Sequence, residues 1–143
     1  MKRGLIMAGF FASLIGLLGC SKEQQKDYKS ADIYRDMRKQ VLTLDPTKIG
    51  LTPAGNNRVW CVLMETGYPE AVATLVMIAD GTVSLYFSNG GGIIGVGQHD
   101  GPRKTGESFL KEAPKFLRYA QATKDFPLPK EGKTRFYFLT FDG

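Results

Sequence analysis

Histidine and cysteine are scarce in this chain, and their scarcity excludes several kinds of site. The 143 residues contain one histidine, His99, and two cysteines, Cys20 and Cys61. A zinc site takes three or four ligands, mostly from these two residue types, so no metal site is predicted. If Cys20 is used elsewhere, Cys61 has no partner for an intrachain disulfide, and the fold must be held together by its core.

Long apolar runs and a large excess of one charge are also missing. The apolar run at residues 5–18 has 14 residues, whereas a membrane-spanning helix needs about 20. The formal net charge is +5, and the basic residues are scattered apart from Arg103-Lys104, which argues against nucleic acid as a partner. The composition, 43% hydrophobic and 23% charged, is that of one globular domain.

The first nineteen residues have the features of a secretory signal peptide. Met1-Lys2-Arg3 is a short basic start, and the apolar run 5–18 follows it, as in exported bacterial proteins. The end of the segment, Leu17-Leu18-Gly19-Cys20, resembles the lipobox of bacterial lipoproteins. That resemblance implies cleavage before Cys20, diacylation of its thiol and acylation of the new amino terminus. An ordinary signal peptide or a short membrane anchor with a coincidental cysteine is the alternative.

The residues after the cysteine predict a lipid-anchored tether at 20–30. Residues 21–30 contain almost nothing apolar, so they cannot contribute to a core. Two or three acyl chains on Cys20 hold a protein stably at a bilayer. The predicted location is therefore the bacterial cell envelope. In a Gram-negative cell, Ser21 in place of Asp after the cysteine favours the periplasmic face of the outer membrane.

Apolar patterns predict one domain over residues 31–143, beginning with a helix. Ile33, Met37, Val41 and Leu44 share one helical face, with Ser30 as the N-cap. Strands are predicted at 58–66, 71–79 and 82–88. The last two are joined by Asp80-Gly81, a pair that favours a two-residue type I′ hairpin. A second helix is predicted from near Pro102, with Asp100 as its cap and a break at Pro114, before a last strand at 134–141.

This order of elements predicts an α+β fold. We expect a two-layer sandwich with an antiparallel sheet of about four strands, a meander of three plus the C-terminal strand, with two main helices on one face. The first two strands are apolar on both faces, so they should be central, or the second sheet face should be covered too. The last strand should pair inside the sheet, beside the first strand or the hairpin. A second copy of the chain would cover any open edge, and a partner protein or a homodimer is the expected kind of partner.

The glycine-rich loop after the third strand is the main candidate site. Gly90, Gly92 and Gly95 have Gly-x-Gly-x-x-Gly spacing, but the strand before them belongs to an antiparallel hairpin, which excludes a dinucleotide-binding unit. Two readings remain: backbone N–H groups that line an anion site, or a tight crossover that needs positive φ angles. The candidate ligand-binding residues are Asn89, Gly90, Gly91, Gly92, Gly95 and His99. No cofactor is predicted.

Three functions follow from these features. The leading one is a non-enzymatic, lipid-anchored protein whose domain binds a partner protein or small ligand near the glycine loop. The second is a small hydrolase or transferase that uses His99 and the N–H groups of Gly90–Gly92 as an oxyanion site. The third is a structural accessory subunit. Cys61, in mid-strand between apolar neighbours, is expected to be buried and unreactive.

The glycine block and its flanks resemble a group of uncharacterised bacterial proteins. The similarity lies in residues 80–99, Val59-Trp60 and residues 126–129, and it covers roughly residues 31–143. Members of the group usually lack a lipobox and continue beyond this C-terminal end. The resemblance therefore implies a single domain but no particular activity.

Overall fold

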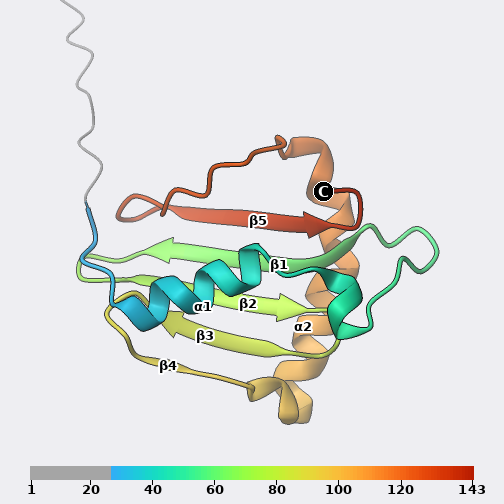
Figure 1. Ribbon diagram of the computed structural model, residues 1–143, viewed down its shortest axis with the longest axis horizontal. Helices are drawn as coiled ribbons and strands as arrows, with labels where there is room; N and C mark the ends of the chain where they lie inside the picture. The colour runs from blue at the N-terminus through green and yellow to red at the C-terminus, as the bar shows by residue number, and fades with distance from the viewer. Residues whose placement is uncertain (1–26) are drawn as a thin grey trace, which may run out of the picture.

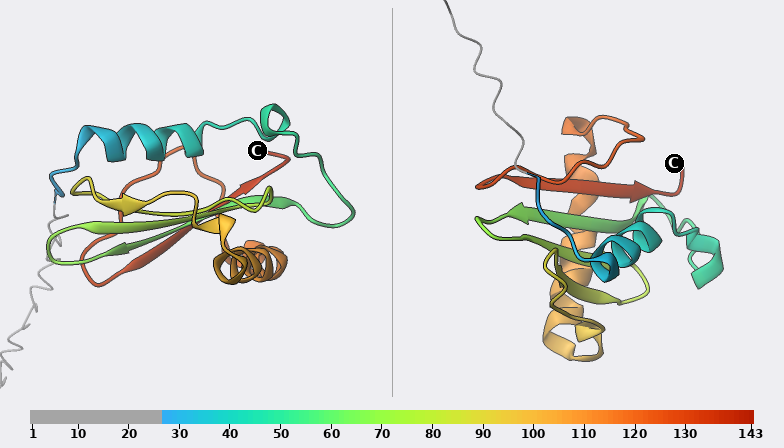
Figure 2. Two further views of the ribbon diagram at one scale, coloured as in Figure 1. Left: turned by 90° about the horizontal axis from the view of Figure 1, so that it is seen from below. Right: turned by 60° about the vertical axis from the view of Figure 1, so that its left-hand side comes forward.

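The computed structural model describes residues 27–143, and the predicted signal peptide, Cys20 and the start of the tether lie outside these residues. The described chain forms one antiparallel sheet of five strands in the order β4-β3-β2-β1-β5. Helix α1 lies over one face of the sheet and α2 lies over the other (Figure 1, Figure 2). The helices are α1 (Asp32–Leu42) and α2 (Asp100–Glu112), and the strands are β1 (Val59–Gly67), β2 (Val72–Ile78), β3 (Val83–Phe87), β4 (Gly92–Ile93) and β5 (Thr134–Thr140).

The α+β class and the antiparallel sheet confirm the sequence prediction, and two details differ. The sheet has five strands because the two-residue β4 pairs with β3, and a strand this short has no periodicity to reveal it. The helices cover opposite faces of the sheet, which makes three layers (Figure 2). Both faces of β1 and β2 are therefore buried, as the apolar character of these strands required.

The alternation of side chains along β1 divides the core in two. Cys61 and Leu63 join Tyr34 and Val41 of α1 in the larger cluster, whereas Val62 points to the other face, where the cluster includes Leu110 of α2. Successive side chains of a strand point to opposite faces. A one-residue slip of β1 would thus exchange the two cores.

The hairpin between β2 and β3 is one residue longer than predicted. The N–H of Ile78 donates to the carbonyl of Thr82 (2.9 Å), and the N–H of Gly81 donates to the carbonyl of Ile78 (3.0 Å). Ala79, Asp80 and Gly81 therefore form the loop. With Gly81 at φ 92°, this matches a three-residue hairpin with glycine in the left-handed position.

The predicted caps of both helices are wrong. Ala31 occupies the N-cap position of α1 and His99 that of α2, and neither makes a side-chain capping bond. In α1 the buried stripe contains Tyr34, whereas Ile33 is 56% exposed. The break at Pro114 is confirmed, because α2 ends at Glu112 and a 3₁₀ segment, η3 (Ala113–Tyr119), follows it.

The last strand pairs with the first, as predicted, but it lies at the edge of the sheet. Residues of β5 pair only with β1 in the described sheet, from Val59↔Thr140 to Thr66↔Thr134. The expectation that this strand lies inside the sheet is therefore wrong. On the α2 face the rings of Phe136 and Phe138 stack with centroids 6.3 Å apart. Phe138 packs against the smaller core, whereas Phe136 stays 42% exposed.

Candidate functional site

The glycine loop begins as a tight turn whose N–H groups are used internally. The N–H of Gly90 donates to the carbonyl of Phe87 (2.9 Å), and the N–H of Gly91 donates to Oδ1 of Asn89 (3.3 Å). Gly90 has a φ of 101°, a conformation that residues with a Cβ rarely adopt. These two N–H groups are therefore not directed at an external anion.

Two glycines of the loop sit where a side chain would collide with a neighbouring segment. A Cβ on Gly92 would lie 2.6 Å from the carbonyl oxygen of Leu85, and a Cβ on Gly90 would lie 3.2 Å from the Cβ of Ala31. The N–H of Ala31 also donates to the carbonyl of Ser88 (2.8 Å). The absence of side chains thus lets β4 pair with β3, and lets the start of α1 pack on the turn.

Gly95 and His99 lie further along the crossover to α2. The N–H of Gly95 donates to Oγ of Ser84 (3.1 Å). His99 is exposed, and its backbone N–H donates to the carbonyl of Val96 (3.0 Å). His99 lines neither of the two hollows described below. The structure therefore brings Asn89 and Gly90–Gly92 together and leaves His99 apart from them.

A small pocket lies between the glycine loop and the first turns of α1. Its volume is about 120 Å³. At its mouth Ile33 and Ile94 are 56% and 69% exposed. We call this hollow the loop pocket; it is lined by Ile33, Tyr34, Met37, Tyr86, Phe87, Gly90, Gly91, Gly92 and Ile94.

Six of the nine residues that line the loop pocket are not among the predicted ligand-binding residues. The three glycines were among the predicted ligand-binding residues, and Met37 was expected on the buried face of the first helix. No pattern in the chain shows that α1 lies against a loop more than fifty residues away. That contact depends on the way α1 folds back over the sheet (Figure 1).

Beneath α1, a buried polar network connects the pocket to the sheet. Tyr34, whose ring lines the pocket, hydrogen-bonds through its hydroxyl to Oγ1 of Thr74 (2.8 Å). The hydroxyl of Thr74 donates in turn to Oε1 of Glu65 (3.2 Å). The Glu65 side chain is fully buried, and Arg38 binds it through two bonds, Nε to Oε1 at 2.6 Å and Nη2 to Oε2 at 2.9 Å.

The network is further supported by the loop that precedes β5. Nη2 of Arg38 also donates to the carbonyl of Phe126 (2.8 Å), and its guanidinium lies 5.8 Å from the centre of the Tyr137 ring. Burial opposes the charge on Arg38, but the hydrogen bonds and charge of Glu65 outweigh it and raise the pKa of the guanidinium. Burial raises the pKa of Tyr34 to about 12, assisted by the charge of Glu65. At neutral pH, Tyr34 and Arg38 thus keep their protons.

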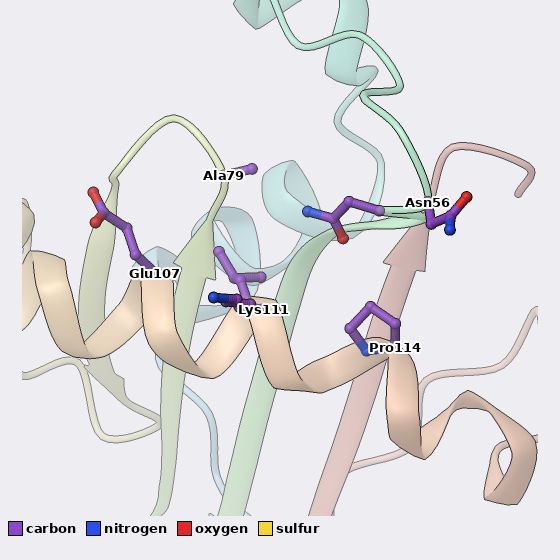
Figure 3. A pocket seen from close by; sticks show the side chains of 7 residues that line it. Asn56, Ala79, Glu107, Lys111 and Pro114 are labelled. Carbon is purple, nitrogen blue, oxygen red and sulfur yellow. The ribbon is translucent and has the colours of Figure 1, made fainter.

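A second, wider hollow opens on the α2 side of the sheet. It has a volume of about 450 Å³ and lies between α2, the loop before β1 and the β2–β3 turn (Figure 3). Its lining mixes apolar and polar groups without a buried charge: Asn56, Asn57, Ala79, Glu107, Leu110, Lys111 and Pro114. Figure 3 shows Glu107 and Asn56 at opposite sides of this hollow. They do not converge on one point, as the side chains of a catalytic site would.

Two further observations bear on chemistry. Cys61 is buried, and burial raises the pKa of its thiol, as expected for a cysteine that is not a nucleophile. Within residues 27–143, no group of three or more histidine, cysteine or acidic side chains is placed to hold a metal ion.

In the same residues, no helix has the length and apolar character of a membrane span.

Comparisons of the chain with protein-family models, with curated proteins and with solved structures find no match. The resemblance of residues 80–99 to uncharacterised bacterial proteins therefore stays a prediction. Any function must be argued from the sequence of the first thirty residues and from the geometry of the loop pocket.

Proposed function

We propose that this chain is a lipid-anchored protein of the bacterial cell envelope whose domain acts as a non-enzymatic binding module. The observation that carries the proposal is the order of its first thirty residues: basic start, apolar run 5–18, Leu17-Leu18-Gly19-Cys20, then a polar segment. The basic start and the apolar run are typical of an export signal, the cysteine would take the acyl chains, and the polar segment would link them to the domain. The described domain starts directly after that polar segment.

The loop pocket is the binding site that the geometry supports best. Its lining is mostly apolar, with exposed isoleucines at its mouth, and binding sites commonly combine apolar walls with a few polar groups. Its volume of about 120 Å³ suits one aliphatic group better than a whole cofactor. The proposed ligand is therefore an apolar side chain of a partner protein.

The enzymatic alternative receives no support from the described residues. It requires His99 beside free N–H groups of Gly90–Gly92. The N–H groups of Gly90 and Gly91 are bonded within the turn, and His99 lies outside the loop pocket. No observation favours the structural accessory subunit over the binding module.

Acylation is tested by growing cells with a labelled fatty acid and comparing two cysteine variants. Label should enter the parent chain and the Cys61→Ala variant, and it should be lost in Cys20→Ser. Mass spectrometry of the amino-terminal peptide should show Cys20 with its lipids as the first residue. An unlabelled parent chain, or label that survives in Cys20→Ser, would refute the anchor.

Binding is tested with a photo-crosslinking amino acid at Ile94 in the full chain in cells. A defined adduct should form there, and the same probe at Tyr119, which is 72% exposed, should not form it. Gly91→Leu should abolish the adduct, because Gly91 lines the pocket, has an ordinary φ and would place a Cβ in ordinary contact with Asn89 and Phe87, at 3.7 and 3.8 Å. Equal adducts at both positions would contradict a specific site.

A further inference from the structure

The described chain enters the domain at one end, on the side of the sequence that leads back to Cys20; we call this the tether end. The β1–β2 turn, the β3–β4 turn and the start of β5 all lie at this end (Figure 1). A Cβ on Gly67 would lie 2.3 Å from the carbonyl oxygen of Lys130 and 2.8 Å from the hydroxyl of Tyr28. Three segments therefore meet here, and the incoming chain is already packed on the sheet at Tyr28.

The chain between this end and the proposed anchor is short. Tyr28 follows Cys20 by eight positions, so the covalent chain between them reaches at most about 28 Å. Strand β1 has nine residues and is about 30 Å long. Even fully extended, the segment from Cys20 to Tyr28 is no longer than β1, so an anchor at Cys20 would keep the tether end nearer to the bilayer than the opposite end of that strand.

Two large apolar side chains are exposed at the tether end. Tyr68, in the β1–β2 turn, is 53% exposed, and Ile33, in the first turn of α1, is 56% exposed. A tyrosine with an apolar ring and a polar hydroxyl is favoured at the level of lipid headgroups. In the described part of the chain, more than half of the surface of each of these residues stays uncovered.

The side-chain charges at the tether end give little electrostatic attraction to, or repulsion from, a membrane with anionic lipids. The basic side chains at this end barely outnumber the acidic ones: Lys29, Arg35, Lys130, Lys133 and Arg135 against Asp27, Asp32, Glu70 and Glu131. Attraction of basic side chains to acidic lipids is therefore weak, and contact must depend on the apolar side chains and the tether. Little dependence on salt is expected.

We propose that the tether end rests on the bilayer surface, with Tyr68 and Ile33 at the level of the headgroups. This inference rests on the proposed acylation of Cys20 and adds an orientation to it. The loop pocket then opens beside the membrane, because Ile33 contributes both to the pocket and to the tether end.

The test uses the full chain, extracted with its lipids and reconstituted into phosphatidylcholine vesicles that contain acyl chains brominated near the headgroup. Bromine quenches tryptophan at short range, and the native Trp60 is buried at 3% exposure, so it supplies a constant background. The probe is Tyr68→Trp, and the matched control is Tyr119→Trp in η3. Mass spectrometry before reconstitution shows independently whether Cys20 is acylated.

Acylated Tyr68→Trp protein should lose at least twice as large a fraction of its added emission as the control, at low and high salt alike. Equal quenching of the two variants, or stronger quenching of Tyr119→Trp, would overturn the orientation and leave the anchor intact. An emission shift of Tyr68→Trp that grows with protein density but not with bromine would instead identify a second copy as the cover. A chain without acyl groups would overturn both proposals.

Discussion

Arg38 on α1 and Glu65 near the end of β1 form an ion pair with two hydrogen bonds, in which the glutamate side chain is completely buried. Twenty-seven residues separate the two in the sequence, and the pair fixes how α1 lies across β1. A buried carboxylate is tolerated only when it is paired and hydrogen-bonded. Arg38 and Thr74 provide those partners here.

Breaking this pair from one side should destabilise the domain strongly. Arg38→Leu leaves the Glu65 carboxylate unpaired in the core, so the free energy of unfolding should fall by about 3–5 kcal/mol. The double variant Arg38→Leu/Glu65→Leu should lose less than Arg38→Leu alone, because it leaves no buried charge. Urea denaturation followed by circular dichroism measures these differences.

The exposed pair of Arg58 and Asp142 is the matched control for that experiment. Their side chains are 63% and 62% exposed, so Arg58→Ala should change the free energy of unfolding by less than about 1 kcal/mol. If Arg58→Ala and Arg38→Leu had similar effects, the pair at Arg38 would not be the contact that holds α1.

The buried hydroxyl of Tyr34 should make the domain sensitive to alkali. Its pKa is raised to about 12 in the folded state from an ordinary value of 10. Above pH 10 the unfolded chain therefore releases a proton that the folded chain keeps, and stability falls as the pH rises from about 10 to about 12. The loss approaches about 3 kcal/mol, at 1.36 kcal/mol for each unit of pKa difference.

Tyr34→Phe should flatten this part of the pH profile. Burial also raises the pKa values of Cys61 and Tyr86, so some alkaline loss should remain in the variant. Urea midpoints at pH 8, 10 and 11.5, with tyrosinate absorbance at 295 nm, separate these contributions. If the pH profile of Tyr34→Phe were identical to that of the parent chain, the pKa of Tyr34 would not be raised in the folded state.

Gly97 should be intolerant of any side chain. A Cβ at this position would lie 2.0 Å from the carbonyl oxygen of Gly81, so Gly97→Ala must push the crossover away from the β2–β3 turn. The expected cost is about 1–3 kcal/mol. Gly101→Ala is the control, since a Cβ there meets nothing within 4 Å and alanine favours the helix by up to about 1 kcal/mol. Thermal unfolding of both variants should give shifts of opposite sign.

Cys61 should react with a thiol reagent only when the domain opens. In a Cys20→Ser chain it is the one remaining thiol, and its side chain has no exposed surface in the fold. Maleimide labelling should therefore be slow in buffer and complete within minutes in 6–8 M urea. Rapid labelling of the folded protein would contradict the buried position between α1 and the sheet.

The sequence by itself determined the strands that carry strong local patterns. Alternation and β-branched residues located β1, β2, β3 and β5 to within one or two residues, and Pro114 located the end of α2, because each signal acts within a few residues of chain. The same locality explains the errors. A strand of two residues, such as β4, is too short to show a periodic pattern. The helical spacing in α1 predicts that Ile33 is buried, but the sheet buries Tyr34.

Only the tertiary structure decided how these elements meet. It put the two helices on opposite faces of the sheet, left β5 at an edge, separated His99 from the glycine turn and placed α1 beside that turn. It also converted Arg38, which looks like an ordinary exposed helix residue, into the partner of a buried glutamate. Such contacts join residues far apart in the chain, and no local pattern encodes them. The acylation signal proposed at Cys20, in contrast, rests on the sequence alone, because a short linear segment is what export and acylation enzymes recognise.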